Sequence, residues 1–379
     1  MNKAEEILEY FRDFNDNAPA RLAQLKQSSG KKMMGWTCNY APIELVLAAD
    51  MIPVRLLSRP GPTTRADVSV QAFCCNVARS YLEQLHKGEL AYLDGFVTPK
   101  VCDCLNHVHE VQSHRKMCAL SHFMQMPHEL VSAPSMVAWE GNIGEFKAAL
   151  EAFSGVQITA DGLSTAVASL NETRRLLRDL YELRKQPHPP IRGEEVLQVV
   201  LAGMMAPTAE YNAKVRELVA ALEGQGTDAQ GVRLMVVGSS VDFTEMGILH
   251  EIEATGGLIV TDEMCTGTRW IYRDVKTDED PFQAVAKRYH YAGMCAAKYP
   301  AHKLRMDNVS RLARDYSVEG VVIVVEKFCD PFAFSAPDTE KLLHDQLNLP
   351  VLVLESAEVQ GLGQVKTRVQ GFIETIRGV

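Results

Sequence analysis

The sequence predicts an α/β protein with two doubly wound parallel-sheet domains, an N-terminal helical segment and a helical connector. Three observations support this prediction. Short strand-like runs alternate with helical patterns over the first 140 residues, and the same alternation returns after residue 230. The stretch between them is helical throughout. The predicted boundaries are 1–30 for the N-terminal segment, 31–140 for the first α/β domain, 141–229 for the connector and 230–379 for the second α/β domain.

The first part of the chain begins with helical periodicity. Ile7, Leu8 and Phe11 recur at helical spacing, so residues 1–29 are expected to form one or two amphipathic helices. Strands are predicted at residues 32–37, 52–57, 95–99 and 117–126. Residues 42–50 predict a helix with Pro42 at a favoured first-turn position. Strands separated by helices in this way form parallel sheets through crossover connections.

The connector and the second domain follow the same logic. Helices are expected at residues 161–182, 194–205 and 208–222, and residues 223–231 (EGQGTDAQG) form a candidate linker. Buried parallel strands are predicted at 232–238, 257–261, 320–325 and 350–354. Helices are expected at 245–255, 281–297, 307–316 and 338–347. Both domains are therefore expected to be Rossmann-like or flavodoxin-like.

Composition narrows the classes of partner. The 379 residues include 46% hydrophobic and 23% charged residues, and 39 basic against 48 acidic side chains give a net charge of −9. This balance argues against a nucleic-acid or membrane partner, although a local basic pocket for a phosphate-bearing ligand stays open. We see no secretory signal and no apolar run approaching the roughly 18 residues of a membrane span. We therefore expect a cytoplasmic protein.

The nine cysteines call for a chemical explanation. Structural disulfides are not expected in a reducing compartment, and an odd count adds to that argument. Buried apolar thiols, a catalytic thiol and metal ligands remain as alternatives. The chain has no C-x-x-C motif, which argues against a zinc ribbon or a bacterial ferredoxin. Any metal ligands must therefore converge from distant loops.

Six cysteines fall at or near predicted strand ends and helix ends. Free cysteine also behaves as a small hydrophobic residue, so any one of them is equally well explained by packing. Packing explains less well why cysteines recur at strand ends in both halves of the chain. Ligand sites in α/β sheets collect at these strand ends. The expected positions are Cys38, Cys102, Cys265 and Cys329 after strands, Cys75 at a helix start and Cys295 at a helix end.

Several runs of the chain together resemble one family. Residues 35–44 (GWTCNYAPIE) and 47–54 (LAADMIPV) resemble the N-terminal signature of the 2-hydroxyacyl-CoA dehydratases and benzoyl-CoA reductase subunits. Cys75 with Arg79 and Ser80, the run 101–103 (VCD), the run 328–331 (FCDP) and the tail 350–376 are also similar. The resemblance covers essentially the whole chain with its motifs in order.

The resemblance implies a function and a cofactor. It implies a 4Fe-4S cluster held by Cys38, Cys75 and Cys329 in the cleft between the domains, with one iron position open. It also implies an activator ATPase as electron donor, a related subunit or second copy as dimer partner, and a CoA-thioester substrate. The reaction would be 2-hydroxyacyl-CoA dehydration through a ketyl radical, or reduction of an aryl-CoA ring.

A second interpretation within the family stays open. The run 262–269 (DEMCTGTR) resembles a Cys-Thr-Gly motif of double-cubane cluster proteins, in which six cysteines hold an 8Fe-9S cluster. Those proteins are homodimers that reduce small molecules with ATP-dependent activation. On this interpretation Cys102, Cys265 and Cys295 join Cys38, Cys75 and Cys329 as ligands. A third possibility is an electron carrier or a cluster-storage module.

The remaining polar residues receive less specific interpretations. We interpret Glu44 as a carboxylate on a helix surface, and Lys298, Lys303 and Arg305 as a basic patch. Cys104 and Cys118 are interpreted as packing residues, and Cys74 as inert unless it substitutes for its neighbour. The sequence identifies no catalytic side chain and no organic cofactor site.

Overall fold

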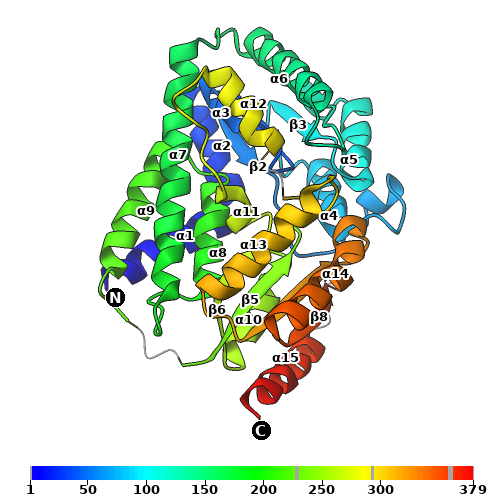
Figure 1. The fold of residues 1–379 in the computed structure, drawn as a ribbon. Helices are drawn as coiled ribbons and strands as arrows, with labels where there is room; N and C mark the ends of the chain where they lie inside the picture. The colour runs from blue at the N-terminus through cyan, green and yellow to red at the C-terminus, as the bar shows by residue number, and fades with distance from the viewer. Residues whose placement is uncertain (1, 227–229, 292–293, 357–361, 379) are drawn as a thin grey trace.

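The computed structural model describes residues 2–226, 230–291, 294–356 and 362–378. Figure 1 shows two sheets with helices packed around them. Each sheet has four strands, in the order β2-β1-β3-β4 and β6-β5-β7-β8, and every strand pair is parallel. The predicted α/β class with two doubly wound sheets is confirmed.

Two helices precede the first sheet. α1 (Lys3–Asp16) begins with a capping box, in which Glu5 accepts a 2.8 Å hydrogen bond from Asn2 N and donates its own N–H to Asn2 Oδ1 at 2.9 Å. α2 (Ala18–Ser29) ends at Gly30, whose φ of 67° is the left-handed conformation that favours glycine at a helix end.

The first sheet is short-stranded and buried. Its strands are β1 (Met33–Trp36), β2 (Ile52–Arg55), β3 (Gly95–Pro99) and β4 (Leu120–Met124). Its helices are α3 (Ile43–Ala48), α4 (Asn76–Lys87) and α5 (Asp103–His114). The four strands and α3 overlap the ranges expected from the sequence. The first three strands are fully buried, as expected for a parallel sheet covered on both faces.

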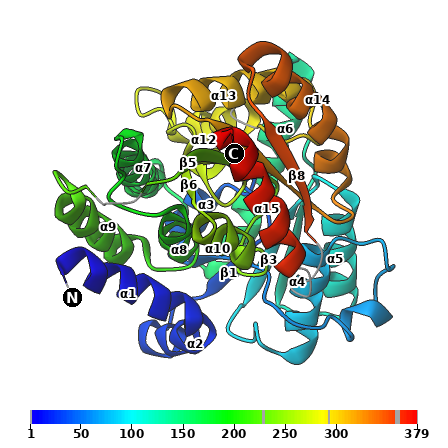
Figure 2. The same ribbon diagram turned by 90° about the horizontal axis from the view of Figure 1, so that it is seen from below.

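Four long helices separate the two sheets along the chain. They are α6 (Ala133–Ser154), α7 (Ala160–Glu182), α8 (Gly193–Gly203) and α9 (Thr208–Leu222). The side chains of Ser132 and Thr159 cap the first two. α1 packs against α8 and α9, and Figure 2 shows these three helices together on one flank.

The second sheet has longer strands. They are β5 (Val232–Gly238), β6 (Gly257–Glu263), β7 (Gly320–Glu326) and β8 (Val351–Ser356). The helices of this part are α10 (Met246–Ala254), α11 (Thr268–Ile271), α12 (Pro281–Tyr291), α13 (Ala301–Asp315), α14 (Asp330–Leu347) and α15 (Leu362–Arg377). α12 packs against α6 and α7, at the top of Figure 1, so this late segment lies beside the first sheet.

Three predicted helix bounds are wrong. The helix expected at 307–316 begins at Ala301, and the one expected at 338–347 begins at Asp330. The second error has a clear cause: Pro337 is typical of a first turn, yet it lies inside α14, whose first turn already contains Pro331. The helix expected at 281–297 ends at Tyr291 among the described residues.

Some predictions fall partly outside the described residues. They are the linker at 223–231, which contains 227–229, the helix at 281–297, which contains 292–293, and the tail at 350–376, which contains 357–361. The four domain boundaries also remain predictions. Within the part of the chain that is described, no helix has both the length and the apolar character needed to cross a membrane.

Candidate metal centre

The parallel topology brings the predicted cysteines to the carboxyl ends of the strands. Cys38 follows β1, Cys102 lies between β3 and α5, and Cys265 follows β6. Cys75 and Cys329 directly precede α4 and α14, at the positive ends of these helices. Helix N-termini stabilise thiolates, so the local structure around these residues suits sulfur ligands.

Cys295 lies in a different setting from the one predicted. It does not end a helix but lies in an irregular segment after α12. Among the described residues α12 ends at Tyr291, and Cys295 begins a turn in which Lys298 N donates to Cys295 O at 3.1 Å. Lys298 Nζ anchors this turn to the first half through the carbonyl oxygens of Lys100, at 3.0 Å, and Met126, at 3.3 Å.

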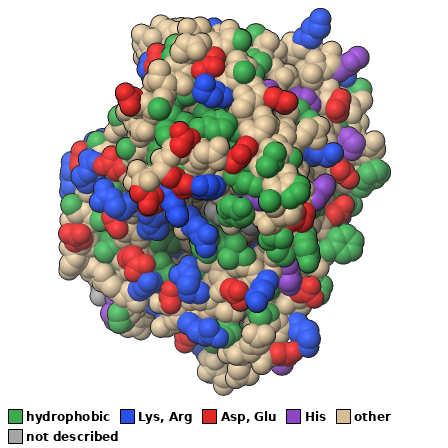
Figure 3. Space-filling model, turned by 45° about the horizontal axis from the view of Figure 1, so that its top comes forward, with side chains coloured by type: hydrophobic (Ala, Val, Ile, Leu, Met, Phe, Trp, Pro, Cys, Tyr) green, Lys and Arg blue, Asp and Glu red, His purple; other side chains and the backbone are tan. Residues whose placement is uncertain are grey.

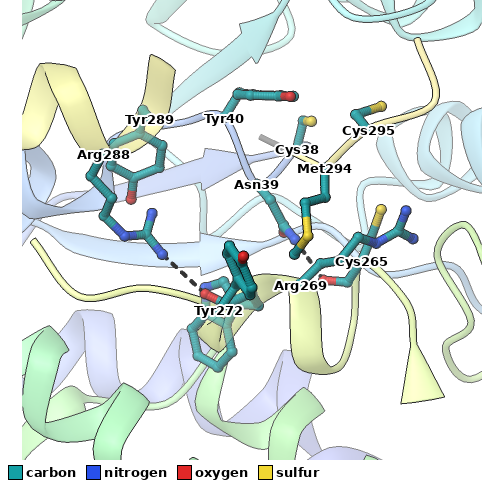
Figure 4. Close-up of a pocket in the computed structure, with 11 residues that line it drawn as sticks. Cys38, Asn39, Tyr40, Cys265, Arg269, Tyr272, Arg288, Tyr289, Met294 and Cys295 are labelled. Carbon is teal, nitrogen blue, oxygen red and sulfur yellow. Dashed lines mark hydrogen bonds between the residues drawn. The ribbon is translucent and has the colours of Figure 1, made fainter. Parts of the chain in front are cut away.

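Three of the cysteines, Cys38, Cys265 and Cys295, line one cavity. The cavity has a volume of about 50 Å³ and is also lined by aromatic and basic side chains. Figure 4 shows the three thiols near one another, on loops that come from both halves of the chain. Asn39 Nδ2 donates a 2.7 Å hydrogen bond to Cys265 O and so joins two of these loops. The other lining residues are Tyr40, Arg269, Trp270, Tyr272, Arg288, Tyr289 and Met294.

The other three cysteines form a second group. Cys75, Cys102 and Cys329 interact electrostatically with one another. Cys329 also interacts with Cys265, and Cys102 with Cys295, so the two groups adjoin. The structure therefore brings all six predicted cysteines into one region, arranged as two sets of three.

Burial is the main cause of the raised pKa of four of these thiols, Cys38, Cys102, Cys295 and Cys329. It raises the pKa of Cys295 and of Cys329 to about 12, with smaller contributions from neighbouring thiols. Burial also raises the pKa of Cys102, and a hydrogen bond to Cys104 followed by burial raises that of Cys75. Thiols of this kind carry their protons at neutral pH, so a bound metal must displace those protons.

The chemistry of the donor set suits an iron–sulfur cluster, which is held by cysteine sulfur. In the described ranges, no three Cys, His, Asp or Glu side chains come close enough to hold one metal ion. Ligands of an iron–sulfur cluster bind different iron atoms and are therefore more widely spaced than ligands of one ion. Six free, mostly half-buried thiols in one region match the sulfur preference of such clusters.

Comparison with known proteins gives the family. The family model described as 2-hydroxyglutaryl-CoA dehydratase, D-component, matches residues 38–376. The chain belongs to this family. It is 28% identical to the (R)-2-hydroxyglutaryl-CoA dehydratase beta subunit of Acidaminococcus fermentans over 380 residues, which cover 98% of this chain and 99% of the relative.

Two further relatives widen the range of named activities. The chain is 26% identical to the putative dehydratase subunit YjiM of Escherichia coli K12, with 98% of each chain covered. It is 24% identical to a benzoyl-CoA reductase subunit of Thauera aromatica, with 92% of this chain and 91% of the relative covered. The predicted resemblance is confirmed: the chain is an enzyme subunit of the 2-hydroxyacyl-CoA dehydratase and benzoyl-CoA reductase type.

Cys104, which the sequence analysis interprets as a packing residue, directly contacts one of the site cysteines. Its Sγ accepts a 3.5 Å hydrogen bond from Cys75 N. Hydrogen bonds from the Cys74 and Cys75 thiols lower the pKa of Cys104, so it is the first thiol of this trio to ionise. In the sequence, only the short C-x-C spacing between Cys102 and Cys104 indicated that Cys104 lies near the site. Cys118 interacts instead with Gln112, away from these thiols.

The interpretation of Glu44 as a surface carboxylate is wrong. Glu44 is fully buried and forms an ion pair with Arg174 of α7, and it accepts a 2.7 Å hydrogen bond from Tyr289 Oη of α12. Burial by itself would raise the pKa of Glu44, but Arg174 and Arg288 outweigh it and lower the pKa. Because its partners lie far along the chain, no local pattern could have revealed this burial.

The predicted basic patch is also wrong. Arg305 is buried and donates from Nε to Glu263 Oε2 at 2.9 Å, and Lys298 is buried at the cysteine site, so only Lys303 is exposed. A different basic feature adjoins the thiol cavity. A second cavity of about 290 Å³ shares Arg288 with it. Its other lining residues are Arg273, Asp274, Lys276, Glu279, Ala284, Lys287 and Tyr291.

Proposed function

We propose that the chain is the iron–sulfur subunit of an ATP-activated, low-potential radical enzyme that acts on CoA thioesters. The reaction is either dehydration of a 2-hydroxyacyl-CoA or reduction of an aryl-CoA. One observation carries this proposal: partly buried thiols from both halves of the chain converge beside a cavity. The names of the relatives, which are dehydratase and benzoyl-CoA reductase subunits, support the choice of substrate.

We infer that Cys38, Cys75 and Cys329 hold a 4Fe-4S cluster, which supplies a low-potential electron when it is bound. The chain's own contribution is to hold the metal through thiolates at two helix N-termini and one loop. Cys75 is buried and Cys38 and Cys329 are half-buried, so the protein limits the access of water to these thiols. The loops on which they lie belong to both halves, so the site requires both sheets to be folded.

The two adjoining cavities support a substrate with a phosphate-bearing tail. The thiol cavity of about 50 Å³ has room for only a few water-sized groups, enough for the reactive end of a small substrate. The second cavity carries three cations, Arg273, Lys276 and Arg288, that form no ion pair within the described part of the chain. Figure 3 shows Lys and Arg side chains gathered beside a hollow in the molecular surface. We infer that the phosphates of a CoA thioester lie there.

The proposal includes partners and a compartment. An activator ATPase delivers the electron, and a related subunit or a second copy of this chain completes the enzyme. The nine cysteines are all free thiols, which supports a reducing compartment and hence a cytoplasmic location.

Metal analysis together with an activity assay tests this function. After anaerobic reconstitution with iron and sulfide, the chain is expected to carry about four irons and four sulfides for one cubane. Together with its partner subunit and activator, it is expected to convert a CoA thioester only when ATP is supplied. A chain that takes up zinc and no iron would exclude the proposal.

A specific observation favours a second candidate, a homodimeric double-cubane protein that reduces small molecules. Six cysteines lie together in two sets of three, whereas one cubane needs only three of them. Three buried cations, Arg55, Arg269 and Lys298, interact electrostatically with these thiols, and such charge compensates six thiolates better than three. About eight irons per chain would support this candidate, and about four would exclude it.

A further inference from the structure

Arg55 lies in an unusual environment at the end of β2. It is the last residue of the strand and is only 4% exposed. In the sheet it pairs with Trp36 of β1, and its guanidinium carbon lies 4.6 Å from the centre of the Trp36 ring. Its main-chain N–H donates to Met204 O at 2.8 Å. These contacts hold the side chain at the carboxyl edge of the first sheet, where Cys38 follows Trp36 by two residues.

The guanidinium of Arg55 has nitrogen donors that make no hydrogen bond among the described residues. Within the ranges that the structure describes, Arg55 Nε and Nη1 have no hydrogen-bond partner, and no carboxylate lies within ion-pair distance. By contrast, the buried Arg174 is paired with Glu44 and Asn171, and Arg305 with Glu263. A buried charged donor without an acceptor costs about 1–3 kcal/mol or more. Because Arg55 lies at the carboxyl edge of the sheet that carries Cys38, its free donors are placed to meet an acceptor that arrives with a ligand there.

The groups around Arg55 indicate what that acceptor is. The charged and titratable groups near Arg55 include Cys38, Tyr81 and Asp242. Asp242 already accepts hydrogen bonds from Ser58 N, Ser58 Oγ and Thr244 N, so its oxygens are occupied. Of these three groups, Cys38 is the one that lines the thiol cavity, and a sulfur that ligates a metal is a thiolate, which accepts hydrogen bonds.

We propose that Arg55 is a positioning residue whose free N–H groups donate to sulfur of the metal group held at Cys38 and thereby raise its reduction potential. This inference rests on the proposed function. Hydrogen bonds and positive charge near cluster sulfurs favour the reduced state, which is more negative by one electron. The electron comes from an external low-potential reductant, and no bond of the chain forms or breaks.

The test is a redox titration monitored by electron paramagnetic resonance on the full-length chain, after anaerobic reconstitution. In Arg55→Gln the reduction potential is expected to become more negative at an unchanged iron content. At a fixed solution potential, the ratio of reduced to oxidised cluster should fall about tenfold, which corresponds to a shift in reduction potential of about 59 mV for one electron. An Arg55→Gln chain with full iron and the wild-type potential would overturn the inference.

Arg184 offers a matched control. It is also buried, lies 4.4 Å from the centre of the Tyr181 ring and has two N–H groups, Nε and Nη2, without partners among the described residues. It is not among the groups that shift the pKa values of the site cysteines most. Arg184→Gln is expected to lower the stability of the chain and to leave the reduction potential unchanged. A potential shifted equally in both variants would contradict a specific role for Arg55.

A second variant covers the case in which Arg55→Gln loads no iron. Arg55→Lys keeps the charge but replaces the planar fork with a compact ammonium group. We expect it to bind iron and to show a smaller shift in the same direction. No shift, or a shift to higher potential, would overturn the inference. A wild-type chain without iron would instead contradict the proposed function, so the two failures are distinguishable.

Discussion

Asn39 Nδ2 donates a 2.7 Å hydrogen bond to the main-chain oxygen of Cys265. Asn39 directly follows Cys38 after β1, whereas Cys265 follows β6, so this single bond joins the cysteine-bearing loops of the two sheets. The stacked rings of Trp36 and Trp270, with centres 6.5 Å apart, join the same two regions. The relative placement of the thiols thus depends on contacts between the halves.

Asn39→Ala is expected to weaken this junction. Loss of the hydrogen bond should lower the free energy of unfolding by about 1 kcal/mol and speed the release of iron to a chelator severalfold. Urea unfolding and chelator kinetics measure the two effects. Asn142→Ala, which removes a 2.8 Å bond from Asn142 Nδ2 to Ala138 O in α6, serves as the control. Equal rates of iron release from both variants would contradict this role for Asn39.

Gly267 shapes the loop after Cys265. A Cβ atom at this position would overlap the carboxylate of Asp262, which accepts a 2.8 Å hydrogen bond from Thr268 N. Gly267→Ala is therefore expected to cost about 1–3 kcal/mol of stability through overpacking and to reduce iron uptake. Thermal unfolding and iron analysis measure these effects.

Gly141 provides the matched change. It lies within α6, and a Cβ there would meet no atom within 4 Å, so Gly141→Ala is expected to stabilise the chain by about 0.5–1 kcal/mol. A Gly267→Ala chain as stable as wild type, with normal iron uptake, would show that the loop tolerates the extra carbon.

Glu44→Gln tests the buried ion pair with Arg174. The substitution leaves Arg174 charged and without an anion, so the free energy of unfolding should fall by about 3–5 kcal/mol. Glu9→Gln, in an exposed pair with Arg12, should change the stability little. Urea unfolding of both variants at neutral pH compares them, and an equal loss in each would contradict the importance of burial.

The same pair has a defined pH dependence. Since the folded pKa of Glu44 is lowered, the pair contributes its stability above the unfolded pKa of about 4.3 and loses it as the pH falls through the folded value. Wild type should therefore lose more stability than Glu44→Gln between neutral pH and pH values below about 4. If the free energy of unfolding falls by the same amount in both proteins as the pH is lowered, this assignment is contradicted.

Single Cys→Ser changes separate the one-cubane and double-cubane interpretations. If Cys102, Cys265 and Cys295 are ligands, each change should lower the iron content, with Cys118→Ser as a thiol control outside the site. If all three variants keep full iron, only Cys38, Cys75 and Cys329 remain as ligands. Iron and acid-labile sulfide assays on anaerobically reconstituted chains give the answer.

Most of the fold was predictable because its signals are local. The β-branched runs at 232–238 and 320–325 and the apolar spacing of residues 208–222 gave elements close to the observed ones. The errors arose where a local signal was ambiguous. Pro337 is typical of a helix start but lies inside α14, and the pattern through Cys295 continues past the last residue of α12.

The cysteines at strand ends were predictable, and their environment was not. Cys38, Cys265 and Cys329 follow parallel strands and therefore lie at the carboxyl ends of the sheets. Their positions in the sequence were enough to predict this placement. The grouping into two sets of three depends on how the sheets face each other. The burial of Glu44 depends on Arg174, 130 residues away, and the free donors of Arg55 appear only when all its neighbours are placed.

The most direct test of the central claim is the iron and sulfide content of wild type, Cys38→Ser and Cys329→Ser. These two cysteines lie at the ends of strands in different sheets. The account predicts at least about four irons and four sulfides per wild-type chain and loss of cluster in both variants. An iron-free wild-type chain, or full iron content in either variant, would contradict a cluster held jointly by the two halves.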